Sequence, residues 1–313
     1  MPSVRRIVHL LLAVQVLGAA VIAYALWRWG GVEPWRGIAT GALVAVGARL
    51  AISLNNFAVS ARHAAPAPEG FALGRMARLR MFCEEFASSM LQSSWLMARA
   101  AARTRIYPGS TAYPVLLLHG YGCNSGFWAY LTPLLDQAHI SHATLDLEPV
   151  TGSIDGYAGA IEHAAQALCT QAGSDKLIVV AHSMGGLAAR AWMRAYGTAR
   201  VAHVITLGTP HHGTALAAMG IGLNAAQMRR DGDWLRELAA SESPATRALV
   251  TSIFSWHDNI VSPQSSSELE GARNIGFGGI GHVALGSNAR ILAAVMGEID
   301  RVNRQRATRQ HEA

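Results

Sequence analysis

Two long apolar stretches open the chain, and a pattern of shorter apolar runs follows them. The first stretch runs from Ile7 to Trp27 after two arginines, and its length is near the ~20 residues that a helix needs to cross a bilayer. The second runs from Gly37 to about Val59 and is weaker, because Arg49 falls inside it. The pattern predicts a membrane anchor over residues 1–61, with two transmembrane helices favoured over one.

The number of spans decides the side of the membrane on which the rest of the chain lies. A cleavable signal peptide is the competing interpretation of the first stretch, but its apolar core is long for one and a second apolar segment follows at once. If both segments cross, the N-terminus and the remainder share a side, and the flanking arginines indicate the cytoplasm. If only the first crosses, the same rule places the remainder outside.

The sequence pattern predicts a linker and a helical connector over residues 62–112. Pro66 and Pro68 mark a short linker near the start of this segment. Apolar residues at near-helical spacing then predict a helix from Leu73 to Ala102, packed on the following domain or on the membrane surface.

From Tyr113 onward, short apolar runs alternate with helical patterns. This alternation predicts a mostly parallel sheet with helices on both faces, the α/β class, in a domain over residues 113–313. Strands are expected at 115–118, 143–147, 177–181, 201–207, 249–255 and 274–277, and helices at 127–138, 157–171, 187–196 and 289–302.

Composition excludes some classes of function. The net charge of +6 comes almost wholly from scattered arginines, and no basic stripe interleaved with aromatic residues predicts nucleic-acid binding. Cys83, Cys123 and Cys169 have no metal-ligand spacing, so neither a metal centre nor a disulfide framework is predicted.

The strongest chemical motif is the hexapeptide from Ala181 to Gly186, which contains Ser183. It follows an apolar strand and precedes a helical pattern, which is the context that a nucleophile elbow requires. The serine of such an elbow sits on a tight turn, so small residues are needed two positions on either side. Ala181 and Gly185 meet this need, although the usual pattern has glycine at the first place.

A second motif, His119-Gly-Tyr-Gly122, directly follows the first strand of the domain. A loop at this place supplies a backbone N–H to an oxyanion hole, and the residue after the nucleophile supplies another. The expected donors are the N–H groups of Tyr121 and Met184. We expect His119 to hold the loop rather than to act as a general base.

With these motifs and the segment Thr206–Thr214, the chain resembles bacterial α/β-hydrolase lipases and esterases of the triacylglycerol-lipase kind, over roughly residues 113–302. The resemblance implies an α/β-hydrolase fold and makes His211 and His212 loop residues rather than metal ligands. It also implies a lid-like insert at about 213–245, for which a packed surface helix is the alternative.

The remaining catalytic groups are expected after the serine, in the order acid and then histidine. Asp258 follows an apolar strand, and His282 lies in a glycine-bracketed loop before the last helix; both match the family's positions for these roles. Asp146 is the main competitor for the acid, and His257 is expected to be a bystander. The predicted triad is therefore Ser183, Asp258 and His282.

These residues predict a serine hydrolase that cleaves carboxylic esters, including lipids, through an acyl-enzyme without a cofactor. Acyl transfer and cleavage of amides or thioesters use the same triad and stay open. A membrane-tethered, non-catalytic scaffold on a hydrolase fold is the alternative from another class. The resemblance and the apolar segments together indicate a bacterial inner-membrane location.

Overall fold

A seven-stranded sheet forms the centre of the region after the arm and connector in the computed structural model, which describes residues 3–312. The strand order is β1-β3-β2-β4-β5-β6-β7, and every neighbouring pair is parallel except β1 with β3. The strands are β1 (Thr104–Arg105), β2 (Val115–Leu118), β3 (His142–Leu145), β4 (Leu177–His182), β5 (Val201–Leu207), β6 (Val250–Ser255) and β7 (Arg273–Phe277).

The strands in the middle of the sheet are buried on both faces. Their successive side chains point to opposite sides of the sheet, and helices cover each side. Leu116 and Leu118 pack in one core cluster with α6 and α7, whereas Val115 and Leu117 pack in a second cluster with α11. This explains why the strands read as continuous apolar runs rather than as alternating ones. The predicted parallel sheet with helices on both faces is confirmed.

Helices and 3₁₀ turns connect the strands, and their bounds differ from the sequence-based expectation in places. The helix expected at 127–138 is a 3₁₀ segment followed by a short α-helix, with Pro133 in the first turn of the latter. The elements after β1 are η3 (Ser125–Tyr130), α5 (Thr132–Gln137), η4 (Asp155–Tyr157), α6 (Ala158–Ala172), α7 (Met184–Tyr196), η5 (Ala215–Met219), α8 (Leu223–Gln227), α9 (Asp233–Ala240), α10 (Pro244–Ala248), η6 (Gln264–Ser267), η7 (Ala284–Gly286) and α11 (Ala289–Glu312).

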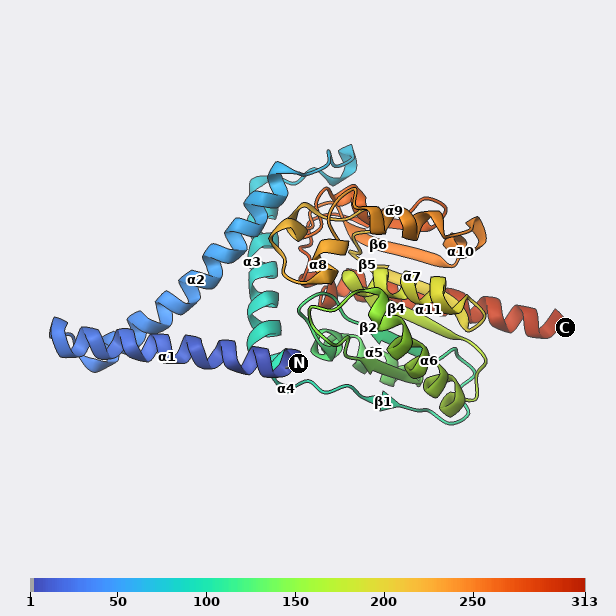
Figure 1. The fold of residues 1–313 in the computed structure, drawn as a ribbon, viewed down its shortest axis with the longest axis horizontal. Helices are drawn as coiled ribbons and strands as arrows, with labels where there is room; N and C mark the ends of the chain where they lie inside the picture. The colour runs from blue at the N-terminus through green and yellow to red at the C-terminus, as the bar shows by residue number, and fades with distance from the viewer. Residues whose placement is uncertain (1–2, 313) are drawn as a thin grey trace.

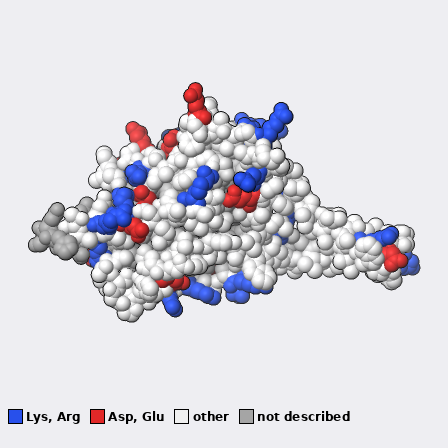
Figure 2. Space-filling model, turned by 180° about the vertical axis from the view of Figure 1, so that it is seen from behind, with Lys and Arg blue, Asp and Glu red and all other residues white. Residues whose placement is uncertain are grey.

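Two long helices, α1 (Val4–Gly30) and α2 (Pro34–Arg62), form an arm that projects from the sheet domain (Figure 1). At about 1.5 Å per residue, each exceeds the ~30 Å thickness of a bilayer's hydrocarbon core. Both are long and apolar enough to cross a membrane. On the face that Figure 2 shows, the shaft of the arm is almost free of charged side chains, whereas its far end carries them; the turn there contains Arg28, Glu33 and Arg36.

Small residues allow the two helices of the arm to touch. A Cβ on Gly41 would collide with the carbonyl oxygen of Ala19, and one on Gly37 would lie 2.9 Å from that of Ala23. Gly37 and Gly41 are four residues apart, the small-xxx-small spacing by which helices approach closely in membranes. The helices then diverge toward the domain, so the arm is V-shaped (Figure 1).

The connector joins the arm to the sheet. It contains η1 (Glu69–Phe71), α3 (Arg75–Leu91), the π-helix η2 (Gln92–Leu96) and α4 (Met97–Arg99), and it ends in β1. Val4 and Val8 of α1 pack in the same core cluster as Met97 and Ala98. The first turns of the arm are therefore part of the domain core.

Candidate active site

Ser183 occupies the turn between β4 and α7, with φ 54° and ψ −125°. This backbone conformation is strained for a residue with a side chain, and such strain occurs at functional sites. The N–H of Ser183 donates to the carbonyl of Leu207 at 2.8 Å, which ties the turn to the next strand. The strand, the strained serine and the helix reproduce the geometry expected of a nucleophile elbow.

Close packing around the turn explains its small residues. A Cβ on Gly185 would lie 2.6 Å from the carbonyl oxygens of both Leu118 and His119. Real Cβ atoms do not approach so closely, so only glycine fits here without a shift of the β2 backbone. Ala181, at the other side of the serine, is fully buried.

Asp258 and His282 lie together at the ends of different strands. His282 Nδ1 is 2.7 Å from Asp258 Oδ2, and both side chains are buried. The other carboxylate oxygen of Asp258 accepts the N–H groups of Ile260 and Val261, each at 2.8 Å. The aspartate is thus fixed by its own loop, with one oxygen aimed at the imidazole.

The surroundings of His282 favour its charged form. Burial lowers the pKa of His282, but the charge and hydrogen bond of Asp258, helped by the charge of Glu85, outweigh it and raise the pKa above its usual value. Asp258 also fixes the tautomer: when Nδ1 carries the proton that faces the carboxylate, Nε2 is free to accept one.

Ser183 and the Asp258–His282 pair meet at the end of β5. The backbone of Ser183 is hydrogen-bonded to Leu207, the last residue of β5. A Cβ on Gly208, which follows Leu207, would lie 3.1 Å from Asp258 Oδ2 and 3.3 Å from His282 Nδ1. The ring of His182 lies 4.6 Å from that of His282. The chain therefore brings together three residues that are separated by up to 99 positions in the sequence.

The loop after β2 lies against the serine. His119 Nε2 accepts the N–H of Leu147 at 2.9 Å, and its Nδ1 donates to the carbonyl of Gly120 at 2.9 Å. Both ring nitrogens are thus occupied in holding the loop. Within the described residues, no hydrogen bond uses the backbone N–H of Tyr121 or of Met184, so both remain available to a substrate.

Asp146, the competing candidate for the acid, points elsewhere. Its carboxylate accepts the N–H of Ser125 at 2.7 Å and lies 3.8 Å from His119 Nε2. His282 faces Asp258 instead. His257, next to Asp258 in sequence, accepts the N–H of Gly279 through Nδ1 at 3.1 Å instead.

Glu85 is a residue near the site that sequence patterns did not single out. It lies on α3, is buried, and its two carboxylate oxygens accept the N–H groups of Val283 at 3.0 Å and Ala284 at 2.9 Å. Burial raises the pKa of Glu85, against the effect of these N–H groups. The only signal in the sequence is a glutamate on the apolar face of an amphipathic helix.

The segment expected to form a lid consists of η5, α8 and α9. The Tyr121 hydroxyl donates to the carbonyl of Ile221 at 2.8 Å and accepts the N–H of the same residue at 3.0 Å. Met219, Ile221 and Leu223 are exposed at this tip. The insert is therefore fastened to the loop after β2 and presents apolar side chains to the outside.

His211 and His212 lie on the loop after β5, as the resemblance implies. His211 is buried, with Nδ1 3.3 Å from Arg190 Nη1 and Nε2 3.2 Å from Thr206 Oγ1. Burial, and then the charge of Arg190, hold the pKa of His211 well below its usual value. It packs as a neutral side chain within the loop.

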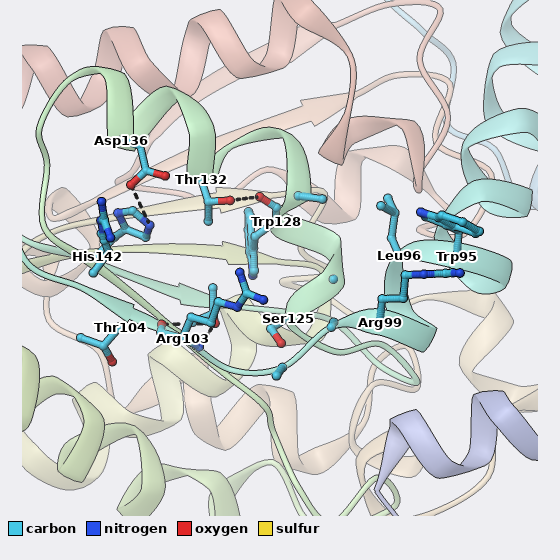
Figure 3. A pocket seen from close by; sticks show the side chains of 16 residues that line it. Trp95, Leu96, Arg99, Arg103, Thr104, Ser125, Trp128, Thr132, Asp136 and His142 are labelled. Atoms are coloured by element: carbon cyan, nitrogen blue, oxygen red, sulfur yellow. Dashed lines mark hydrogen bonds and ion pairs between the residues drawn. The ribbon is translucent and has the colours of Figure 1, made fainter.

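A cavity of about 550 Å³ lies apart from this constellation. It is formed between the connector and the segment from η3 to α5, with Arg99, Arg103, Trp128 and Asp136 in its wall (Figure 3). Ser183, Asp258 and His282 do not line it.

A mostly parallel sheet with a strained serine directly after a central strand defines the α/β-hydrolase class. Residues 113–282 match the alpha/beta hydrolase fold family, which is more than half of the chain. The chain belongs to this family.

Solved structures agree on the fold. The mature lipase BlEst2 of Bacillus licheniformis is 17% identical, with a TM-score of 0.55 and coverage of 64% of this chain and 97% of that one. Lipase B of Aspergillus fumigatus is 18% identical, with a TM-score of 0.52 and coverage of 64% and 55%. A thermophilic esterase from Thermogutta terrifontis is 16% identical, with a TM-score of 0.50 and coverage of 65% and 93%.

Proposed function

We propose that this α/β-hydrolase is a membrane-anchored serine hydrolase that cleaves carboxylic esters. Ser183 is the nucleophile, His282 the general base and Asp258 the residue that orients it. The observation that carries the proposal is the buried 2.7 Å contact between His282 and Asp258, adjacent to a strained serine on a nucleophile elbow. A hydrogen bond from Ser183 to His282 need not be formed in the free protein, since such bonds often tighten only with substrate.

In the proposed reaction, Ser183 Oγ attacks the ester carbonyl carbon while His282 Nε2 takes the hydroxyl proton. The negative charge that develops on the carbonyl oxygen is stabilised by the N–H groups of Tyr121 and Met184. His282 returns the proton to the departing alcohol, which leaves an acyl-enzyme on Ser183. Water then attacks the acyl-enzyme by the same route in reverse and releases the carboxylic acid.

The apolar arm is the reason for proposing a substrate that lies in the membrane. Residues 1–61 serve as the anchor, residues 62–112 as the connector and residues 113–313 as the catalytic domain. The segment at about 213–245 acts as a lid, and its exposed Met219, Ile221 and Leu223 provide an apolar surface toward lipid. Lipid-like esters are therefore the substrates we favour, and no cofactor takes part in the proposed steps.

Fluorophosphonate labelling and a panel of p-nitrophenyl esters test the proposal on the full-length protein in detergent. We expect labelling of wild type on Ser183 alone, and loss of ester hydrolysis in Ser183→Ala, Asp258→Asn and His282→Ala. By analogy with other triads, the aspartate change lowers kcat about 10⁴-fold. Folded wild-type protein that neither labels nor hydrolyses any ester contradicts the assignment and favours a non-catalytic scaffold.

A further inference from the structure

Arg49 is a cation inside the arm without an acidic partner. It lies in the middle of α2, and Nε donates to Gln15 Oε1 at 2.8 Å. Its Nη1 donates to the hydroxyls of Ser93 at 3.1 Å and Ser94 at 2.7 Å. None of the ion pairs formed within residues 3–312 includes Arg49. Only neutral hydrogen-bond acceptors within the described residues therefore stabilise its charge.

An ionisable residue in a membrane-spanning helix is costly, and it usually marks a functional site. Three of the four hydrogen-bond acceptors of Arg49 lie on α3 and η2, and η2 is a π-helix, a form that often occurs at functional sites. No hydrogen bond within the described chain uses Nη2. The guanidinium is thus held through Nε and Nη1, which leaves the donors of Nη2 for a ligand, and Arg49 lines the space beside it.

That space is a crevice of about 450 Å³ between α1, α2 and α3. Gln15, Arg49 and Ser94 form its polar end. The rest of its wall is apolar and consists mostly of small and branched residues, among them Val16, Ala19, Ala20, Ala23, Ala42 and Val46. The volume falls within the ~300–1,000 Å³ of typical small-molecule sites.

A second cavity, of about 250 Å³, continues on the other side of Arg49. It shares Leu12, Gln15, Arg49 and Met90 with the crevice, and its wall also contains polar residues such as Ser53, Asn56 and Ser89. Polarity therefore rises from the shaft of the arm toward the domain, with the guanidinium at the boundary. An amphiphile with an apolar chain and an anionic head has the same gradient.

We propose that this crevice binds a long-chain fatty acid, with its carboxylate on Arg49 and its chain along α1 and α2. A carboxylate oxygen accepts from Nη2, and the hydroxyl of Ser94 lies beside it as a further donor. A volume of about 450 Å³ suits the single chain of a fatty acid better than the two chains of a phospholipid. This site is distinct from Ser183 and does not depend on catalysis.

The test uses full-length protein in phosphatidylcholine nanodiscs and palmitic acid that carries a diazirine and an alkyne. We expect photolabel on peptides of α1 and α2, displaced by excess palmitate and not by hexadecanol at the same concentration. Arg49→Gln weakens labelling about tenfold to a hundredfold, the effect of one charged hydrogen bond. Arg49→Lys retains part of it, and Arg28→Gln, at the turn of the arm, leaves it unchanged.

A second variant separates binding from folding. Ala42→Phe keeps Arg49 but fills the crevice, and we expect it to abolish labelling while the protein stays monodisperse. Ser183→Ala labels as wild type does, so a failed hydrolase proposal leaves this result intact. Equal displacement by hexadecanol, or undiminished labelling of Arg49→Gln, overturns the proposal. Loss of label on replacing phosphatidylcholine with phosphatidylglycerol overturns it too, in favour of a phospholipid headgroup.

Discussion

Glu85 holds the backbone that carries His282: its carboxylate accepts the N–H groups of the two residues that follow the histidine. A Cβ on Gly281, on the other side of His282, would lie 2.5 Å from Glu85 Oε2. The carboxylate thus contacts the loop before and after the histidine. Since α3 belongs to the connector, a residue outside the matched residues 113–282 supports the candidate site.

Replacing this carboxylate should change the pH profile as well as the rate. The charge of Glu85 contributes to the raised pKa of His282, and His282 must be neutral to accept a proton. In Glu85→Gln we therefore expect the acidic limb of kcat/KM to move to lower pH, with kcat reduced more than KM is changed. Glu84→Gln, which removes the charge of a neighbouring carboxylate that accepts from Asn288 instead, is the matched control. An unshifted limb in Glu85→Gln would mean that Glu85 carries no charge in the active protein.

The two hydrogen bonds between the Tyr121 hydroxyl and the backbone of Ile221 should regulate access to the candidate site. Tyr121→Phe removes both hydrogen bonds of the hydroxyl but leaves the backbone N–H in place. At about 0.5–1.5 kcal/mol each, their loss should favour an open lid severalfold or more. We expect faster hydrolysis of short, water-soluble esters and weaker dependence on added lipid surface. Tyr130→Phe, an exposed tyrosine of η3, serves as control; a slower Tyr121→Phe enzyme would argue against a lid.

The close contact between α1 and α2 should contribute to the stability of the protein. Gly41→Leu places a side chain against the backbone of Ala19, whereas a Cβ on Gly47 of the same helix meets nothing within 4 Å. Overpacking of this kind costs about 1–3 kcal/mol. In detergent, we expect Gly41→Leu to lower Tm by several degrees and Gly47→Leu to leave it nearly unchanged. Equal effects of the two variants would mean that the contact between α1 and α2 is not maintained in solution.

His203 should make the fold sensitive to acid. It is buried beside Thr251 and Arg301, and burial, followed by the charge of Arg301, lowers its pKa to about 4. The unfolded chain takes up a proton near pH 6.5 and the folded chain does not, so stability falls as pH drops from about 6.5 to 4. This histidine alone accounts for up to about 3 kcal/mol.

Thermal melting between pH 7 and 5 measures this effect. We expect the decline in Tm to be smaller in His203→Gln than in wild type. Parallel curves for the two proteins would show that His203 is not the responsible group, and that other buried histidines, such as His211, determine the response.

The sequence predicted the parts of the fold whose signals are local. β2 and β5 begin and end where their apolar runs do, because buried strands of a parallel sheet need continuous apolar residues. Ser183 was predicted as the nucleophile because the elbow needs small neighbours within two positions, and the structure places it on such a turn. Asp258 and His282 were predicted because each follows a strand in the order that the class requires, and the structure places them in contact; their catalytic roles stay predictions.

Features that depend on tertiary contacts could not be predicted in the same way. β1 has two exposed residues and no apolar run, so its pairing with β3 leaves no periodic signal. Glu85 is one of several charged residues on α3, and its role depends on a loop almost 200 positions later. The prediction of a helix from 127 to 138 was wrong in its first half, where Phe127 and Trp128 lie in a 3₁₀ helix and pack in the core.

The packing of Val4 and Val8 into the domain core fastens the start of the arm to the sheet domain. A catalytic domain on a flexible tether samples many heights and orientations above a bilayer. Here a spanning arm would instead fix the distance and tilt of Ser183 relative to the lipid surface. Such an enzyme meets its substrates by lateral diffusion within one leaflet, so their density in that leaflet, rather than their concentration in bulk water, would set its rate.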